Sequence, residues 1–463
     1  MLQPDPNLSA PDLKPALTRF WELSGAKIRL IDNEYDHTNG SPVFTAAGKY
    51  TTRGWTEWTQ GFEFGSGVLQ FDATGEEWFL EFARNNTLAR MAPHLSHFGV
   101  HDHGFNNVST YGNLLRLHHS GACEGNQWEQ EFYRLALKLS ASVQAKRWTR
   151  TANGGFIHSF NGPHSLFVDT IRSCRSLALG HMLGHRFMDE GDREISLLGR
   201  LVKHARATAE YSVYYGENRD LYDSEPGRTT HEAVFNTVSG QFRCPATQQG
   251  YSAFSTWTRG LAWAMLGFSE QLEFIRELND EDLIPLGGRD EIEKIFLKAA
   301  CATCDFFINN TPADGIPYWD TGAPGLSRLG SSYLDTNSDP FNEHEPVDSS
   351  AAAIGAQGLI RLGRYLDLKT KDGSRYFQAG LTVAKSLLSD PYLSTLQDHQ
   401  GLILHSIYHR PNGWDHIPEG SRIPRGESSM WGDYHARELA LYIGRIADGS
   451  DYRFFDCAQP TNE

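Results

Sequence analysis

Two aspartates lie beside residue types that could do acid–base chemistry. Asp102 lies in HFGVHDHGFNN, between His101 and His103, and Asp169 lies in SLFVDTIRSC, after an apolar stretch and before a predicted helix. Two carboxyl groups in one pocket can act as a proton donor and a stabilising anion. An aspartate at a helix start more often caps the helix, so for Asp169 the capping interpretation stays open on these residues alone.

The HDH segment at 101–103 contains residue types that also bind metals. Adjacent residues in an extended turn point in different directions, and the chain has no second histidine pair at i, i+4 with a glutamate. We therefore predict no metal and no cofactor. A serine nucleophile is not predicted either, because no GxSxG string is present.

The segment QQGYSAFSTWTRGLAWAMLGF is the most specific string of the sequence. It holds Gln249, Arg259 and Trp263, and the last two lie one helical turn apart. An arginine fork beside an indole can hold a carboxylate and a ring together. An arginine packed over a core tryptophan is the alternative that these residues alone leave open.

Apolar residues recur at helical spacing along the whole chain, which predicts an all-α protein. Three stripes show this spacing: Phe132, Leu135, Leu139 and Val143; Ile195, Leu198, Val202, Ala205 and Ala209; and Trp257, Leu261, Met265, Phe268 and Leu272. Further helices are predicted around residues 8–24, 64–82, 106–121, 168–188, 290–308, 348–366, 374–389 and 433–447. Segments 216–254, 309–347 and 408–430 predict long loops, where functional sites usually lie.

Two of these helices have the character of inner helices. The helix at 257–272 carries apolar residues on one face and Arg259 and Trp263 on another, so both faces should be packed. The small residues of 348–366 permit close contact with other helices. Asp348 or Ser349 would cap the second helix. We predict a single domain, residues 1–463, in which helix pairs close into a ring and residues 1–50 pack around it.

Composition excludes some function classes. The 463 residues include 42 basic and 57 acidic side chains, a formal charge of −15, which argues against a binder of nucleic acid or of an anionic membrane surface. Six cysteines are too few for a disulfide scaffold, and the CxxC of Cys301 and Cys304 is interpreted as two buried helical thiols. With no signal-like start and no long apolar run, we expect a cytoplasmic protein, a monomer or weak homo-oligomer.

From about residue 50 to 447 the order and spacing of the motifs resemble the unsaturated glucuronyl hydrolases, glycoside hydrolase family 88. EWTQGF at 57–62 is similar to the family's WTSGF, HDHGF at 101–105 to its HDLGF, QGYSAFSTWTRGLAW at 249–263 to its QGYxDxSxWxRGQAW, and FVDTIRS at 167–173 takes the place of its IDNMMNL. DGIPYWD at 314–320, DSSAAAI at 348–354, GLILHS at 401–406 and WGDYHARELAL at 431–441 follow in the expected order.

The resemblance implies a fold, an activity and a set of site residues. The fold would be a six-hairpin (α/α)6 barrel, and the activity would be removal of a 4,5-unsaturated glucuronic acid from the non-reducing end of lyase-made oligosaccharides. Asp169 would be the general acid/base and Asp102 the second essential carboxylate. The implied substrate-binding residues are Trp58, His101, Phe160, His231, Gln249, Arg259 and Trp263.

The sequence departs from the family pattern at three places. Thr170 and Arg172 follow the predicted acid/base where the family has an amide and methionines, and Phe160 stands where the family has a tryptophan. RGLAW is nearer to the family's RGQAW than to the RGNGW of the unsaturated rhamnogalacturonyl hydrolases, family 105. Those enzymes, another α/α-barrel sugar enzyme such as an epimerase, and a catalytically silent carbohydrate-binding barrel remain the alternatives.

The implied reaction sets two expectations. We expect burial and the charge of Asp102 to outweigh the helix N-terminus and raise the pKa of Asp169, so that it can donate a proton near neutral pH. Because substrate and protein are both negative, local donors must bind the substrate carboxylate. We expect these donors to be Arg259, His231, His101 and Arg172.

Overall fold

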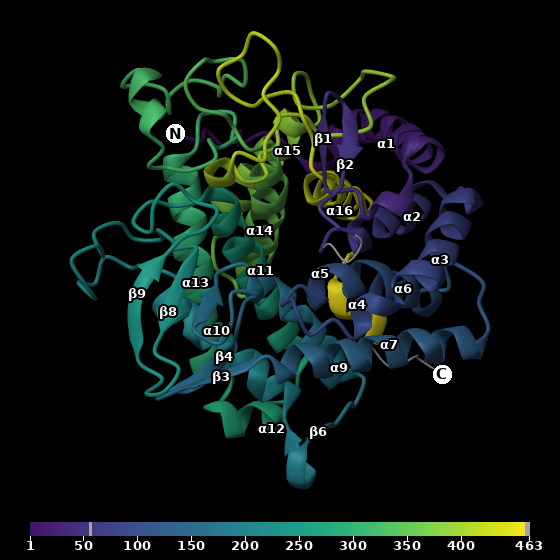
Figure 1. Ribbon diagram of the computed structural model, residues 1–463, viewed down its shortest axis with the longest axis vertical. Coiled ribbons are helices and arrows are strands. Elements are labelled where there is room, and N and C mark those ends of the chain that lie inside the picture. Colours follow the sequence, from purple (N-terminus) through teal and green to yellow (C-terminus); the bar gives the residue numbers. More distant parts are fainter. Residues whose placement is uncertain (55–57, 459–463) are drawn as a thin grey trace.

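The computed structural model describes residues 1–54 and 58–458, and within them six helical segments form a closed inner ring (Figure 1). In order around the ring these are α2 (Gln60–Thr74); α5 (His103–Asn107) with the π-helical turn η3 (Val108–Gly112) and α6 (Asn113–His119); α8 (Thr170–Ser173) with α9 (Arg175–Met182); α11 (Thr258–Glu277); α14 (Ser349–Leu368); and α16 (Met430–Ala447). Each segment packs against the next, and α16 packs back against α2.

A second layer of helices surrounds the ring. It consists of α3 (Glu77–Arg90), α7 (Gln127–Lys146), α10 (Leu197–Tyr211), α13 (Arg289–Asn310), α15 (Ser374–Leu387) and α1 (Lys14–Glu34), and the short α4 (Ala92–Leu95) and α12 (Asp280–Leu283) lie in connections. Each outer helix packs against an inner neighbour, such as α3 on α2, α13 on α11 and α15 on α14. The described residues thus form the double ring of helix pairs that the sequence predicts.

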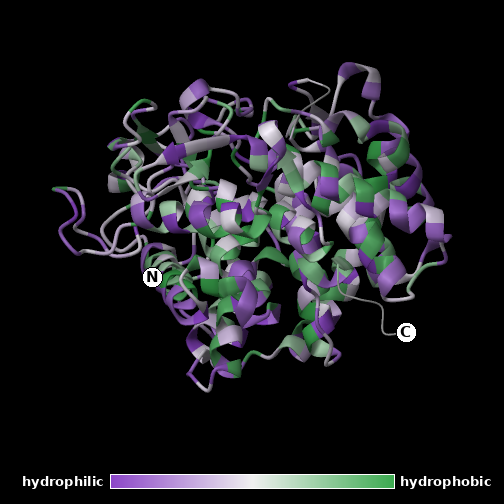
Figure 2. Ribbon diagram, turned by 90° about the horizontal axis from the view of Figure 1, so that it is seen from below, coloured by the Kyte–Doolittle hydropathy of each residue, from purple (hydrophilic) through white to green (hydrophobic). Residues whose placement is uncertain are grey.

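Burial explains which helices lie inside. Residues 258–275 of α11 and 349–363 of α14 are buried on every face, whereas the outer helices bury one stripe. A helix that is buried all round can only be an inner element. Figure 2 shows hydrophobic residues concentrated where helices face one another. The prediction that the helix at 257–272 is packed on both faces is confirmed, and Asp348 caps α14 as predicted, since its side chain accepts hydrogen bonds from the backbone N–H groups of Ser350 and Ala351.

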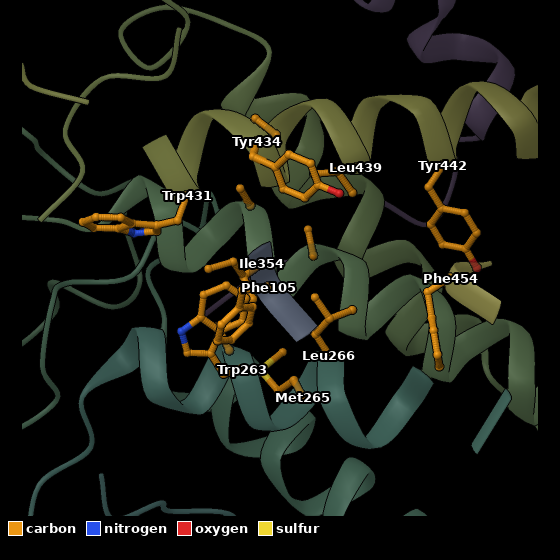
Figure 3. Close-up of a cluster of buried hydrophobic side chains, with 14 of the residues drawn as sticks. Phe105, Trp263, Met265, Leu266, Ile354, Trp431, Tyr434, Leu439, Tyr442 and Phe454 are labelled. Atoms are coloured by element: carbon orange, nitrogen blue, oxygen red, sulfur yellow. The ribbon is translucent and has the colours of Figure 1, made fainter. Parts of the chain in front are cut away.

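The centre of the ring is filled by large side chains from facing helices. Figure 3 shows Trp263, Met265 and Leu266 of α11 directed towards Tyr434 and Leu439 of α16, with Ile354 and Phe105 between them. The rings of Phe105 and Trp263 lie 4.8 Å apart between centroids. The barrel interior is therefore a packed core beneath the site, not a channel.

The loops between the helices contain short strands. These are β1 (Phe44–Ala46), β2 (Lys49–Thr51), β3 (Trp148–Thr151), β4 (Gly154–Ile157), β5 (Ser165–Phe167), β6 (Phe187–Asp189), β7 (Arg193–Ile195), β8 (Glu232–Phe235) and β9 (Phe242–Ala246). β1–β2, β3–β4 and β6–β7 are antiparallel hairpins, and β5, β8 and β9 form one antiparallel sheet. The predicted loop 216–254 thus contains two strands, because β5 offers β8 a partner that is distant in sequence.

Several predicted helix boundaries are wrong. The helix predicted at 64–82 is two helices, α2 and α3, because Gly75 takes a left-handed conformation (φ +70°) that ends α2. The helix predicted at 168–188 ends at Met182 and is followed by β6. The helix predicted at 8–24 begins at Lys14 and continues to Glu34.

The predicted apolar stripe of α7 is wrong at two of its four residues: Phe132 packs against the core and Val143 is buried, but the two leucines are not. Leu135 and Leu139 are 64% and 43% exposed. The buried face uses smaller residues, including Ala136, Ser140 and Ala141. Ala141 lies against Gly180 of α9, where an added Cβ would approach it to 2.5 Å. Small residues thus allow the close packing of α7 on α9, while Leu135 and Leu139 lie outside this contact.

The N-terminal segment lies against the barrel. The backbone N–H of Leu2 donates to the carbonyl of Ile308, and α1 packs against α2 and α16. Cys301 and Cys304 lie in α13 as unpaired thiols, as predicted, although only Cys304 is fully buried. None of the helices in the described residues is long and apolar enough to span a membrane.

Candidate active site

A cavity of about 430 Å³ lies at the end of the ring where the inner helices begin. Eight of the predicted site residues line it: Trp58, His101, Asp102, Phe160, Asp169, Gln249, Arg259 and Trp263. Trp58 precedes α2, Asp102 and Asp169 precede α5 and α8, and Arg259 lies in the first turn of α11. The positive ends of these helix dipoles therefore favour an anion in the cavity of this acidic protein.

Both aspartates occupy helix N-cap positions without capping. Asp102 precedes α5 and Asp169 precedes α8, yet neither side chain accepts a hydrogen bond from its own helix. Both carboxyl groups line the cavity instead. The capping interpretation of Asp169 is therefore wrong, and the two carboxyl groups are available for chemistry.

Close packing of α5 and α8 brings the aspartates together. The backbone N–H of Gly104 donates to Ser173 Oγ at 2.9 Å, and Ser173 Oγ donates to the carbonyl of His101 at 2.6 Å. A Cβ on Gly104 would lie only 2.0 Å from the carbonyl oxygen of Ser173. The glycine of the HDHG segment is thus required for the contact that positions Asp102 and Asp169 in one site.

The sheet next to the site fixes the approach to Asp169. β5 pairs with β8, and one step beyond β5 the backbone N–H of Val168 donates to the carbonyl of His231 at 3.0 Å. Asp169 therefore lies between a hydrogen-bonded strand and a helix, and both restrict the position of its backbone.

His101 lies between the two carboxyl groups. Its Nε2 is 3.2 Å from Asp169 Oδ1, a hydrogen bond, and 3.8 Å from Asp102 Oδ1. The imidazole is stacked near Phe160 and meets Phe167 edge-on at 5.5 Å between ring centroids. Only one of the two carboxyl groups thus receives a hydrogen bond from this histidine.

The pKa values of the three groups follow from this arrangement. Burial raises the pKa of Asp102, and the charge of Asp169 adds to the rise against the opposing charge of His101. Burial also acts to raise the pKa of Asp169, but the hydrogen bond and charge of His101, with His231 and Arg259, lower it overall. Burial acts to lower the pKa of His101, but both aspartates raise it overall.

The expected rise in the pKa of Asp169 is therefore wrong. Burial acts in the expected direction, but the sequence argument omitted His101 as a hydrogen-bond donor to Asp169. The carboxyl group that burial leaves protonated more readily is Asp102, because the nearest His101 nitrogen is beyond hydrogen-bond distance.

Arg259 lines the cavity, and its guanidinium is hydrogen-bonded to other groups of the protein. It donates to Asp348 Oδ2 at 3.1 Å, to Gln249 Oε1 at 2.9 Å and to the carbonyls of Ile407 and Tyr408. The indoles of Trp257 and Trp431 flank it at 4.6 and 4.8 Å from their ring centroids. Its fork is therefore engaged by the protein, and it adds positive charge to the cavity wall and orients Gln249.

Two predicted donors do not reach the cavity wall. His231 is buried behind Phe167 and Trp257, accepts a hydrogen bond from the backbone of Gln248, and has a pKa lowered by burial to about 4. Arg172 points into the core, where it donates to Glu270 at 2.6 Å and Glu438 at 2.8 Å. The prediction that Arg172 binds the substrate carboxylate is wrong, because this ion-pair network holds α8 to α11 and α16.

Aromatic rings form much of the wall. Trp58 stacks on Trp431 with 5.1 Å between ring centroids, and Phe160 is 54% exposed at the cavity. Flat apolar faces of this kind suit the faces of sugar rings. Part of the chain's aromatic content, 12% of its residues, thus lies at the site.

Other lining residues were not predicted. The remaining cavity residues are Arg53, Gly54, His97, Val100, Phe105, Phe167, Gln248, Trp257, Tyr408, His409, Asn412 and Trp414. Four of them lie in 408–430, a segment whose predicted loop character was the available signal. Arg53 lies with its guanidinium over Trp414, 4.6 Å from the ring centroid, and forms no ion pair with the carboxylates of the described residues.

Within residues 1–54 and 58–458, no group of three or more His, Cys, Asp and Glu side chains is placed to hold a metal ion.

Comparisons with known proteins agree with this geometry. The sequence model of the family described as Glycosyl Hydrolase Family 88 matches residues 36–300. The unsaturated glucuronyl hydrolase of Bacillus sp. (strain GL1) is 26% identical over 420 residues, which are 89% of this chain and 92% of that protein. An unsaturated chondroitin disaccharide hydrolase of Streptococcus agalactiae serotype III is 24% identical over 83% of this chain and 81% of that protein.

Solved structures show the same fold. An unsaturated glucuronyl hydrolase specific for heparin superposes with a TM-score of 0.70 at 20% identity, covering 95% of this chain and 99% of that one. The Bacillus sp. GL1 enzyme superposes with a TM-score of 0.68 at 22% identity, covering 92% and 97%. The predicted all-α, α/α-barrel fold is confirmed.

Proposed function

The chain belongs to glycosyl hydrolase family 88, and from this premise we propose that it is an unsaturated glucuronyl hydrolase. It removes a 4,5-unsaturated glucuronic acid from the non-reducing end of oligosaccharides made by polysaccharide lyases. The observation that carries the proposal is the pair of non-capping aspartates that share one aromatic cavity with His101. Family membership favours this function over the family 105 and epimerase alternatives.

The reaction is hydration of a vinyl ether. A proton adds to C4 of the double bond, and the positive charge spreads over C5 and the ring oxygen. Water then adds at C5, and the resulting hemiketal opens to release the aglycone. Attack at C5 means that the distance between the carboxyl groups does not predict the stereochemical outcome in the usual way for glycosidases.

We assign the proton transfer to Asp169 and the second carboxyl role to Asp102. Asp169 delivers the proton to C4 and, once ionised, accepts a proton from the attacking water. Asp102 faces the same cavity and orients that water. The shared cavity supports this assignment, because both carboxyl groups line it and so can reach the same sugar ring.

The substrate's carboxylate is bound by local positive potential. Arg259 supplies charge from the wall, Gln249 presents its amide beside it, and Arg53 lies at the cavity with no carboxylate partner in the described residues. Trp58, Phe160 and Trp263 provide apolar faces for the sugar rings. His231 acts indirectly, through Phe167 and the backbone that leads to Asp169.

We further propose that the enzyme works in the cytoplasm, without metal or cofactor, as a monomer or weak homo-oligomer. The six cysteines, all unpaired, support a reducing compartment.

The test is an absorbance assay on a panel of lyase-made unsaturated disaccharides. We expect the wild type to abolish the ultraviolet absorbance of the enol ether, and Asp169→Asn and Asp102→Asn to lose about 100-fold or more in kcat. Asp290→Asn, an exposed residue in the first turn of α13, is the matched control and should retain activity. Wild-type cleavage of saturated aryl glucuronides alone would overturn the proposal.

A further inference from the structure

Building on the proposed function, we propose that His101 stores the proton that Asp169 delivers. In the resting enzyme the proton lies on the imidazole, and it passes to Asp169 along their hydrogen bond when the substrate enters. His101 is then a positioning residue for the proton, and the acid of this enzyme is the pair of His101 and Asp169.

The contacts of His101 place a proton on Nε2 next to Asp169 Oδ1. Nε2 reaches Asp169 Oδ1 at 3.2 Å, and Asp102 Oδ1 lies 3.8 Å from the same nitrogen. Nδ1 is buried without a hydrogen-bond partner among the described residues. The imidazolium is therefore hydrogen-bonded through Nε2 only. No hydrogen bond at Nδ1 stabilises the charged form, so none is lost when the proton leaves Nε2.

Other titratable groups around His101 do not compete for this role. His158, His204 and His231 have pKa values lowered by burial to about 4, 3 and 4, so they are neutral near pH 7. Arg147 is a permanent positive charge whose effect on His101 is to lower its pKa. Asp102 and Asp169 raise the pKa of His101, so it is the only one of these four histidines whose pKa is raised.

Substrate binding supplies the driving force for the transfer. Phe160 lines the same cavity as His101 and Asp169, so a sugar ring that packs against Phe160 would displace water from beside the pair. Charge separation costs more in a drier site, so the neutral imidazole and carboxylic acid become favoured. The Nε2–H bond breaks as the Oδ1–H bond forms, and this O–H then breaks as the π electrons of the double bond form the C4–H bond.

The proton returns by the same route. Water adds to the cation at C5, and its released proton goes to the Asp169 carboxylate and back to His101. No other reactant is needed, because each turnover consumes one water and restores the starting pair.

The inference predicts where activity is lost as pH rises. A group with a raised pKa keeps its proton below that pKa, so the pair is active until pH passes the raised pKa of His101. Without the imidazole, Asp169 must hold its own proton; burial acts to raise its pKa, whereas His231 and Arg259 act to lower it. A carboxyl group ordinarily loses its proton at lower pH than an imidazolium. The alkaline limb of kcat should then fall at lower pH.

The test uses the full chain in two measurements. Ring-¹⁵N histidine labelling follows the titration of His101, whose signal is identified by its loss in His101→Gln. We expect His101 to titrate above its ordinary pKa in the wild type and at lower pH in Asp169→Asn. A His101 that is neutral where the wild type is most active, or that ignores Asp169→Asn, overturns the inference whatever the substrate is.

The second measurement is the pH profile of kcat on an unsaturated disaccharide. We expect His101→Gln to move the alkaline limb down by about one pH unit or more, since the ordinary pKa values of imidazole and carboxyl groups differ by roughly 2.5. His164→Gln removes an exposed imidazole that does not line the cavity and should leave the limb in place. A lower kcat with an unmoved limb shows a merely structural role and contradicts the inference, whereas an inactive wild type contradicts the proposed function itself.

Discussion

At the residue scale, Asp102 and Asp169 differ in one hydrogen bond, and this sets how each carboxyl group affects stability. Asp169 accepts from His101 and has a lowered pKa, whereas Asp102 lies beyond hydrogen-bond distance of the same nitrogen and has a raised pKa. The ionised form is thus favoured by folding at Asp169 and opposed by folding at Asp102.

The two asparagine variants should therefore change the free energy of unfolding in opposite directions. The cost of ionising buried Asp102 sets in as pH rises from its unfolded pKa through its raised folded pKa, so Asp102→Asn should be more stable than the wild type at pH 8. The benefit from Asp169 is present above its unfolded pKa and is lost as pH falls through its lowered folded pKa, so Asp169→Asn should be less stable at pH 8. Denaturant unfolding from pH 4 to 8 measures the free energy of unfolding of both variants. A loss of stability in Asp102→Asn at pH 8 would contradict the raised pKa of Asp102.

Arg53 should contribute to substrate binding and little to the chemical step. It lines the cavity over Trp414, and none of the ion pairs among the described residues includes it. We expect Arg53→Gln to raise KM about 5- to 10-fold with nearly unchanged kcat, because glutamine keeps a hydrogen-bond donor but loses the charge, a difference of about 1–1.4 kcal/mol. Arg19→Gln on the exposed side of α1 is the control, and an equal KM for wild type and Arg53→Gln would refute this role.

The sequence motifs predicted the location of most site residues but not their contacts. Eight predicted residues line one cavity, because each lies at the start of an inner helix or in the adjoining loop, and motif spacing encodes those starts. The engagement of Arg259 with Asp348, and of His101 with Asp169, depends on residues 89 and 68 positions apart. Such pairings arise from the closed ring and have no local signal.

At the element scale, the contact between α5 and α8 determines whether the two aspartates share a site. Gly104 meets the backbone of Ser173, and nothing on either helix is flexible enough to yield to a methyl group there. The two helices would have to separate to admit a side chain.

Gly104→Ala should therefore lower stability and activity together. We expect a loss of about 1–3 kcal/mol from overpacking and a fall in kcat of at least about 10-fold as Asp102 moves away from Asp169. Gly444→Ala in α16 is the matched control. Its added Cβ has no neighbouring atom within 4 Å, so the change should be neutral or slightly stabilising. Thermal unfolding and the absorbance assay measure both effects, and wild-type behaviour of Gly104→Ala would show that the contact is not needed.

Helix periodicity predicted the inner and outer elements better than their ends. The all-round burial of α11 was readable because both of its faces carry large or demanding side chains. The strands β5 and β8 were missed because each has three or four residues and gains its partner only after the chain folds. The stripe of α7 was wrong at Leu135 and Leu139 because the close contact with α9 is made by a neighbouring face that includes Ala141.

At the scale of the whole molecule, the net charge of −15 and the anionic substrate are compatible because the inner helices start at one end of the ring. Their N-termini, with Arg53 and Arg259, create a small positive region within an acidic protein. The helices of the described residues form two concentric layers.

We propose that residues 1–463 form one domain, with the N-terminal segment part of its stability. Leu2, Leu8 and Leu13 are buried, and α1 packs between α2 and α16. We expect one thermal transition, coincident by circular dichroism and tryptophan fluorescence, and a lower midpoint when residues 1–13 are removed. Two separate transitions in the full chain would contradict a single domain.

The central claim is that this enzyme hydrates the double bond of a terminal unsaturated glucuronic acid. Its most direct test compares a lyase-made unsaturated disaccharide with the same disaccharide carrying a saturated glucuronic acid, following enol-ether absorbance and aglycone release together. The account predicts that the unsaturated sugar loses its absorbance as the aglycone is released and that the saturated sugar is untouched. Cleavage of the saturated disaccharide at a comparable rate, or no loss of absorbance from the unsaturated one, would contradict it.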